Sequence, residues 1–116
     1  LAKGLERDAC ALPAMVVLRM ATLSGARALG LGEEIGSLSP GKSADIIAVD
    51  LSSPETQPVY NPVSQLVYAA GREQVRHAWI RGRQVLHNRQ PTSLDTQLIV
   101  ERADAWRQQI EGTDNT

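Results

Sequence analysis

The segment Ala14–Leu29 constrains the fold most, because it predicts a helix that is apolar around most of its circumference. Ala, Leu, Met and Val dominate this segment, and Pro13 before it suits the first position of a helix. Such a helix has to be covered on several sides, so Met15 and Met20 are expected to lie in a core. Gly30 is placed to end the helix.

Small residues in the middle of this helix predict a local change in its course. Thr22 and Ser24 can cap a break that divides it into two shorter helices. The pair Gly25-Ala26 would let a neighbouring backbone approach closely. We therefore expect a divided helix with a close contact at its centre.

The middle of the chain predicts one strand and one turn of helix. Ala44–Leu51 is a short β-branched run typical of a buried strand. A loop follows it, and Val63–Ala70 then predicts a short helix for which Asn61 is the cap. The loop is marked by Pro54, Pro58 and Pro62.

The last third predicts a β-hairpin at 75–88 and an amphipathic helix at 93–111. The hairpin strands, 75–80 and 83–88, are joined by Arg81-Gly82, where glycine can adopt the positive φ of a tight turn. Thr92 is the expected helix cap, with Asp95 three residues later. Apolar residues then recur at helical spacing at Ile99, Ala103, Trp106 and Ile110, the helix ends near Gly112, and residues 113–116 have nothing to bury.

These elements do not add up to a self-sufficient fold. Three strands gain little stability unless further strands or a helix cover them, and an open sheet edge invites pairing with another chain. A chain of 116 residues forms one domain at most. We expect the partner strands to lie outside these residues, and we expect the opening Leu1-Ala2-Lys3-Gly4 to be that of the middle of a longer chain.

Residues Gly36–Ser43, GSLSPGKS, match the phosphate-binding pattern G-x-x-x-x-G-K-[ST]. In a P-loop a strand precedes the glycines and a helix follows, whereas here the helix comes first and the strand second. Pro40 removes one amide donor, and Pro40-Gly41 suits a type II turn. We interpret the stretch as a turn in which Lys42 leads into a strand, with nucleotide binding as the weaker alternative.

His77 and His87 are the two histidines, and both fall in the hairpin, where strand pairing can bring them together. A catalytic zinc takes three protein ligands and a water, so two histidines do not predict a zinc site. Asp45 and Asp50 are the candidate acid–base pair, but alternation places residues five apart on opposite faces of a strand. No residue is assigned a catalytic, cofactor-binding or metal-binding role.

A group of arginines surrounds the hairpin, and Trp79 or Tyr68 could stack on single-stranded nucleic acid. The formal net charge of −1 gives no general field that would attract nucleic acid or an anionic membrane. Cys10 is the single cysteine, which excludes an internal disulfide and fits a reducing, cytoplasmic compartment. We expect neither nucleic-acid nor membrane binding. The arginines are Arg72, Arg76, Arg81, Arg83 and Arg89.

The run LRMATLSGARALGLGEEIGSLSPGKSADIIAVDL (18–51) resembles the C-terminal part of the amidohydrolase superfamily. There a helix of the form AT-x-x-GA-x-x-LG is followed by IG-x-[LI]-x-x-GK-x-ADI and a strand. The stretch PVYNPVSQLVYAAGREQVRHAWIRGRQVLHNRQ (58–90) is similar to the deaminase and chlorohydrolase branch. The resemblance covers residues 12–110.

The resemblance implies an α/β (α+β) fragment in two parts. Residues 1–36 would be the last helices of a (β/α)₈ metal-hydrolase barrel. Residues 37–116 would be the C-terminal part of a composite β-sandwich, with the hairpin and the terminal helix. The family's metal, zinc or iron, is held by an HxH pair, two further histidines and an aspartate, and none of these positions falls here.

The activity implied for the parent protein is hydrolysis of a C–N or C–Cl bond on a purine-like or triazine-like ring by metal-activated water. These residues alone are expected to be inert. The expected partners are the missing barrel and strands, or another copy in an oligomer formed by strand exchange. The alternatives are a free-standing association module and, more weakly, a nucleotide-binding domain.

Overall fold

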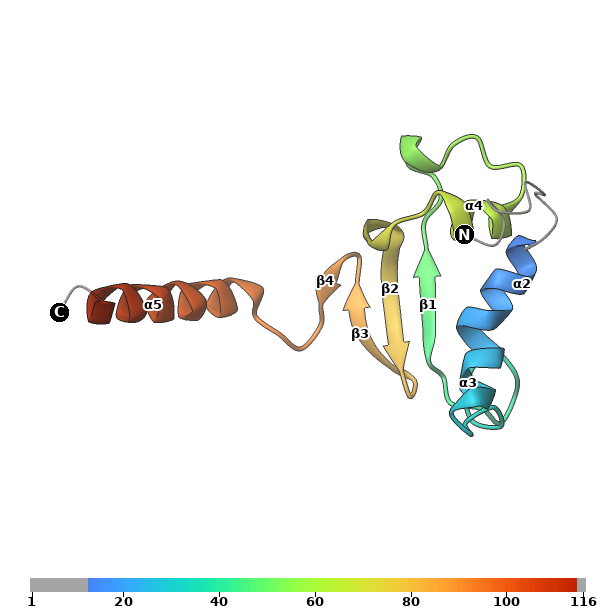
Figure 1. Cartoon of the computed structure of the whole chain (residues 1–116), viewed down its shortest axis with the longest axis horizontal. Helices are drawn as coiled ribbons and strands as arrows, with labels where there is room; N and C mark the ends of the chain where they lie inside the picture. The colour runs from blue at the N-terminus through green and yellow to red at the C-terminus, as the bar shows by residue number, and fades with distance from the viewer. Residues whose placement is uncertain (1–12, 115–116) are drawn as a thin grey trace.

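The computed structural model describes residues 13–114 and begins with one continuous helical segment (Figure 1). It consists of α2 (Ala14–Arg19), a π-helical turn η1 (Met20–Ser24) and α3 (Gly25–Ala28). The predicted break is wrong: Ser24 keeps right-handed helical angles, with φ −65° and ψ −39°. The Thr22 hydroxyl donates to the Leu18 carbonyl at 2.8 Å, so it bonds back within the helix instead of capping a new one.

Gly30 ends this helical segment, as predicted. Its φ is +76°, and its N–H donates to the Arg27 carbonyl at 3.0 Å. The Leu31 N–H donates to the Ala26 carbonyl at 2.8 Å. This pair of bonds is the Schellman arrangement, which satisfies the last carbonyls of the helix.

The loop after the helix folds back across it at Gly36. A Cβ at Gly36 would lie 2.8 Å from the Ala26 Cβ and 2.9 Å from the Leu23 Cα. The close approach predicted at Gly25-Ala26 is therefore found at Ala26, which is 5% exposed. The Ser43 N–H then donates to the Glu34 carbonyl at 2.8 Å and leads the chain into the sheet.

A four-stranded antiparallel sheet follows, with the strands in the order β1-β2-β3-β4. The predicted strand 44–51 is shorter in the structure, where the paired residues run from Ile46 to Val49, and the Ala44 carbonyl before them accepts from the Gly82 N–H at 3.0 Å. This bond joins the strand entry to the hairpin turn. The strands are β1 (Ile46–Val49), β2 (Val75–Ile80), β3 (Arg83–His87) and the unpredicted β4 (Gln90–Pro91).

The hairpin of β2 and β3 is confirmed, with Ile80 paired to Arg83. Arg81 has φ +51° and Gly82 has φ +80°. Two consecutive positive φ angles define a type I′ turn, whose twist matches that of the paired strands. The turn residues therefore adopt the conformation that the glycine indicated.

The long connection between β1 and β2 contains η2 (Pro54–Thr56), α4 (Pro62–Tyr68) and η3 (Arg72–Gln74). Asn61 caps α4 as predicted, because its Oδ1 accepts from the Val63 N–H at 3.0 Å and from the Ser64 N–H at 3.3 Å. α4 lies against α2.

The C-terminal helix α5 (Thr96–Asp114) stands away from the sheet (Figure 1). The predicted cap, Thr92, is wrong: its hydroxyl donates to the Gln84 carbonyl of β3 at 2.7 Å. Asp95 caps the helix instead, accepting from the Leu98 N–H at 3.1 Å. The helix also continues through Gly112, beyond the predicted end at 111.

Within residues 13–114, Ala26 and Thr56 are the buried residues. Met15 and Met20 are 59% and 57% exposed, so the expectation that they lie in a core is wrong. The physical reason is that the described part of the chain packs little against that side of the helix. That this helix needs cover on several sides stays a prediction, and the described residues do not supply that cover.

The architecture is thus a mixed one of helices beside an antiparallel sheet. Within the part that the structure describes, no helix is both long and apolar enough to cross a membrane.

Candidate functional site

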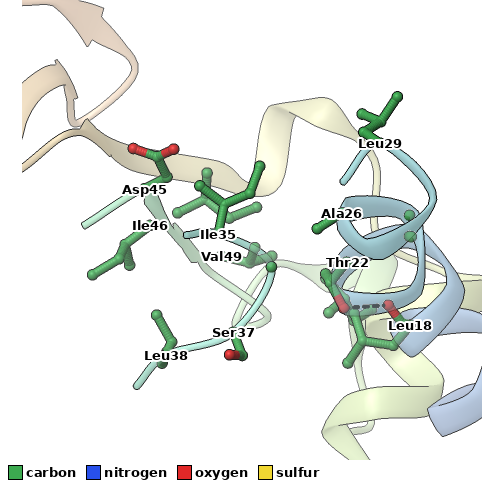
Figure 2. Close-up of a pocket in the computed structure, with 15 residues that line it drawn as sticks. Leu18, Thr22, Ala26, Leu29, Ile35, Ser37, Leu38, Asp45, Ile46 and Val49 are labelled. Carbon is green, nitrogen blue, oxygen red and sulfur yellow. Dashed lines mark hydrogen bonds between the residues drawn. The ribbon is translucent and has the colours of Figure 1, made fainter. Parts of the chain in front are cut away.

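An apolar groove of about 680 Å³ lies between the N-terminal helical segment and β1 (Figure 2). Figure 2 shows Thr22 and Ala26 on the helix side, with Ile46 and Val49 on the strand side and Ser37 and Leu38 on the loop. The full lining is Leu18, Ala21, Thr22, Gly25, Ala26, Leu29, Ile35, Gly36, Ser37, Leu38, Asp45, Ile46, Ile47, Val49 and Leu66.

This groove offers apolar contact and little catalytic chemistry. Its one ionisable side chain is Asp45, whose Oδ1 already accepts from the Ser43 hydroxyl at 3.0 Å and the Arg81 N–H at 2.8 Å. Leu29 and Leu38 are 75% and 78% exposed. A surface of this kind binds another apolar surface better than it binds a polar substrate.

The groove follows an open sheet edge, because β1 is the first strand in the sheet order. Ile46 and Ile47 both line it, although successive residues of a strand point to opposite faces. The groove therefore runs along the edge of β1. From the sequence alone, this groove was not identified as a site. Two features could have indicated it: the helix that is apolar around most of its circumference and the β-branched strand.

The stretch GSLSPGKS forms a turn, as interpreted from the sequence. The Lys42 N–H donates to the Ser39 carbonyl at 3.2 Å, and Gly41 has φ +89°, as a type II turn requires. The Lys42 ammonium donates to the Gly32 carbonyl at 2.6 Å and to the Ser37 hydroxyl at 2.8 Å. Lys42 thus closes its own loop.

The two histidines do meet across the hairpin, with ring centroids 5.0 Å apart and planes tilted by 44°. His77 Nδ1 accepts from the Asn88 N–H at 3.2 Å, and His87 Nδ1 lies 3.1 Å from the Gln84 amide nitrogen. Within residues 13–114, no group of three or more His, Cys, Asp or Glu side chains could hold a metal ion. This pair does not fit a catalytic metal centre.

Asp45 and Asp50 lie beyond opposite ends of β1 and do not form an acid–base pair. Asp50 Oδ1 accepts from the Ser52 hydroxyl at 2.6 Å and from the Ser52 N–H at 2.8 Å. These two bonds hold the pKa of Asp50 below its usual value. Both carboxylates therefore act on local backbone structure.

The arginine cluster is split by the hairpin. Arg81 and Arg83 lie at the turn, whereas Arg76 and Arg89 lie at the other end, where the Arg89 N–H donates to the Arg76 carbonyl at 3.0 Å. The Arg89 guanidinium donates to the Val75 carbonyl at 3.0 Å. The arginines therefore do not form one continuous basic patch.

The remaining candidates are dispersed. Trp79 lies on β2, with its ring centroid 6.0 Å from that of His77. Tyr68 is at the end of α4, on a different element. Cys10 lies outside the described residues.

Comparison with known proteins finds one matching family and relatives that share one name. Residues 1–85 match the Amidohydrolase family. A 5-methylthioadenosine/S-adenosylhomocysteine deaminase of Syntrophobacter fumaroxidans is 51% identical over 100 residues, which are 86% of this chain and 23% of the relative. The enzyme of the same name from Teredinibacter turnerae is 44% identical over 103 residues, 89% of this chain and 23% of the relative.

Solved structures agree with these relatives. A zinc-bound adenosine deaminase from Xanthomonas campestris is 50% identical, with a TM-score of 0.83 over 96% of this chain and 25% of that one. A triazine hydrolase variant is 26% identical, with a TM-score of 0.76 over 89% of this chain and 23% of that one.

The chain thus spans about a quarter of the length of its relatives (23% for the two deaminases). The family match covers more than half of the chain, from residue 1 to residue 85. The relatives and the solved structures carry the names of deaminases and of a triazine hydrolase. This chain belongs to the amidohydrolase family.

Proposed function

We propose that this chain is the C-terminal portion of a hydrolase that removes the amino group of 5-methylthioadenosine or S-adenosylhomocysteine. The observation that carries the proposal is the 51% identity to a deaminase of that specificity over 86% of the chain. The triazine hydrolase, at 26% identity, supports the fold more strongly than it supports a C–Cl substrate.

The finer architecture belongs to the same proposal. Residues 1–36 would end the barrel and residues 37–116 would complete a composite β-sandwich in a cytoplasmic enzyme. Two observations support this arrangement: an apolar groove along a free sheet edge, and a helix whose Met15 and Met20 are more than half exposed. Both surfaces are of the kind that another part of a protein covers.

The catalytic metal would be zinc, held by the part of the protein outside these residues. The zinc-bound Xanthomonas relative supports this choice over iron. Because His77 and His87 do not fit a metal centre, no step of the reaction is assigned to the described residues. Their role would be to complete and stabilise the catalytic unit.

A chimera tests the proposal. In the Syntrophobacter deaminase, the matched segment is replaced by this chain, and the ammonia released from each substrate is measured with zinc present. The expected result is deamination by the chimera and none by the 116-residue chain alone. The relative lacking the matched segment is the control.

Two results would contradict the proposal. Turnover by the isolated chain would show that a catalytic site lies within these residues. A folded, zinc-loaded chimera that deaminates neither substrate would refute the role of this chain in completing a deaminase, and would leave a non-catalytic association module as the better interpretation.

A further inference from the structure

The C-terminal helix carries an apolar stripe that nothing else in residues 13–114 covers. Ile99, Ala103, Trp106 and Ile110 are spaced four, three and four residues apart, which places them in one narrow line along a helix of 3.6 residues per turn. Trp106 is 72% exposed, Ile110 63% and Ile99 50%. A line of exposed apolar residues this long is a candidate contact surface.

Most charges on α5 lie away from this stripe, whereas Arg102, three residues from Ile99 and four from Trp106, lies at its edge. Arg107 binds Asp104 at 2.8 Å and Glu111 at 3.1 Å, and these carboxylates lie more than a quarter turn around the helix from Trp106. Glu101 lies on the far side. The stripe is therefore an apolar surface with polar groups beside and behind it, as in a helix that packs by one face.

The segment that leads into α5 is bonded to the sheet at Thr92. The Thr92 N–H donates to the Val85 carbonyl at 3.1 Å, and the Thr92 hydroxyl donates to the Gln84 carbonyl at 2.7 Å. Asp95 then starts the helix. These contacts hold Thr92, four residues before α5, against β3, so the connection to the helix leaves the sheet from a defined point.

The comparison with a longer solved chain shows that α5 has a counterpart in a larger protein. The Xanthomonas structure matches 96% of the 116 residues with a TM-score of 0.83. The unmatched 4% of 116 is no more than about 5 residues, whereas α5 has 19, so most of α5 has a counterpart there. In that structure the match covers 25% of the chain, so three quarters of it lie outside the match.

We propose that α5 is a docking element for the rest of the hydrolase, with Trp106 as the side chain that anchors it. This inference rests on the proposed function, since the occupant is the remaining three quarters of a protein built like the relatives. The apolar stripe and the matching helix in a longer relative together favour that occupant over a second copy of this chain.

Hydrogen exchange of α5 tests the docking directly. The amide exchange rates of 96–114 are compared between the 116-residue chain and the chimera with the Syntrophobacter deaminase. Docking predicts rapid exchange in the isolated chain and marked protection in the chimera, because the helix then packs against the rest of the protein.

Two variants of the chimera identify the anchor. Trp106→Ala is expected to raise the exchange rate of α5 by about a hundredfold, because it removes a large packed side chain. Gln108→Ala is the matched control on the opposite face of the helix. It is expected to leave the exchange rate and the deaminase activity unchanged.

The outcomes separate this inference from the proposed function. If the chimera deaminates its substrate while α5 exchanges as fast as in the isolated chain, docking is refuted and the function stands. If α5 is protected in a chimera that has no activity, the function fails and docking stands. A third outcome would overturn the proposal: α5 is protected in the isolated chain, and sedimentation shows dimers that Trp106→Ala abolishes. The stripe would then bind a second copy of this chain.

Discussion

Replacing Gly36 by alanine should open the loop that joins the helix to the sheet. An alanine Cβ would lie 2.8 Å from the Ala26 Cβ and 2.9 Å from the Leu23 Cα, closer than such atoms pack. The φ of +95° adds a conformational cost, since L-residues disfavour this region. Strain costs about 1–2 kcal/mol and overpacking about 1–3 kcal/mol, so the total is about 2–5 kcal/mol.

Gly41→Ala is the matched control for the overpacking contribution. Gly41 has a similar φ of +89°, but nothing lies within 4 Å of the position that its Cβ would take. This variant should therefore lose about 1–2 kcal/mol, the conformational cost alone. The difference between the two variants measures the contact between the loop and the helix.

Amide exchange of Ser43 gives the free energy of opening in each variant. Its N–H donates to the Glu34 carbonyl at 2.8 Å and is protected only while the loop is closed. Equal losses for Gly36→Ala and Gly41→Ala would refute the close approach of loop and helix. An unprotected Ser43 in the unmodified chain would refute the loop structure itself.

Three further changes test single contacts. Lys42→Met keeps the aliphatic stem but removes two charge-assisted hydrogen bonds, and should lower the free energy of unfolding by about 1–3 kcal/mol in a thermal melt. ATP with Mg²⁺ should leave the melting temperature of the unmodified chain unchanged, because Lys42 already bonds within its own loop. Gly112→Ala, inside a helix with open space around the site, should stabilise α5 by about 0.5–1 kcal/mol, and circular dichroism measures the gain in helicity. Ser52→Ala removes the main hydrogen-bond donor to Asp50 and should raise the pKa of that carboxyl towards 3.8, as an NMR titration would show. Because the pKa of Asp50 is lower in the folded state than in the unfolded state, its contribution to stability is present above pH 3.8 and is lost as the pH falls below that value. An unchanged titration would contradict the role of the Ser52 hydroxyl.

Local signals in the sequence predicted the local structure well. The Pro40-Gly41 turn, the Arg81-Gly82 turn and the cap at Asn61 each depend on a few neighbouring residues, and all three are present in the structure. The physical reason is that φ preferences and caps act within one turn of chain. The resemblance to amidohydrolases, which rests on such motifs, is likewise confirmed by the family match.

Features that depend on distant contacts were not predictable in this way. Thr92 has a good capping sequence, but its hydroxyl bonds to Gln84 on β3, eight residues away. Met15 and Met20 have core residue types, yet their burial depends on a covering surface that the described residues do not supply. The groove also arises from two segments that meet only after folding, since Ala26 and Ile46 are twenty residues apart.

The scarcity of buried residues has a consequence for the living cell. Under the proposed function, a polypeptide in which Ala26 and Thr56 are the buried residues of the described part would depend on the rest of the hydrolase for most of its folding free energy. Copies made without the rest of the hydrolase would be removed by proteases and chaperones. Harmful mutations in this region would therefore lower the abundance of the proposed hydrolase more than the rate at which each surviving molecule works.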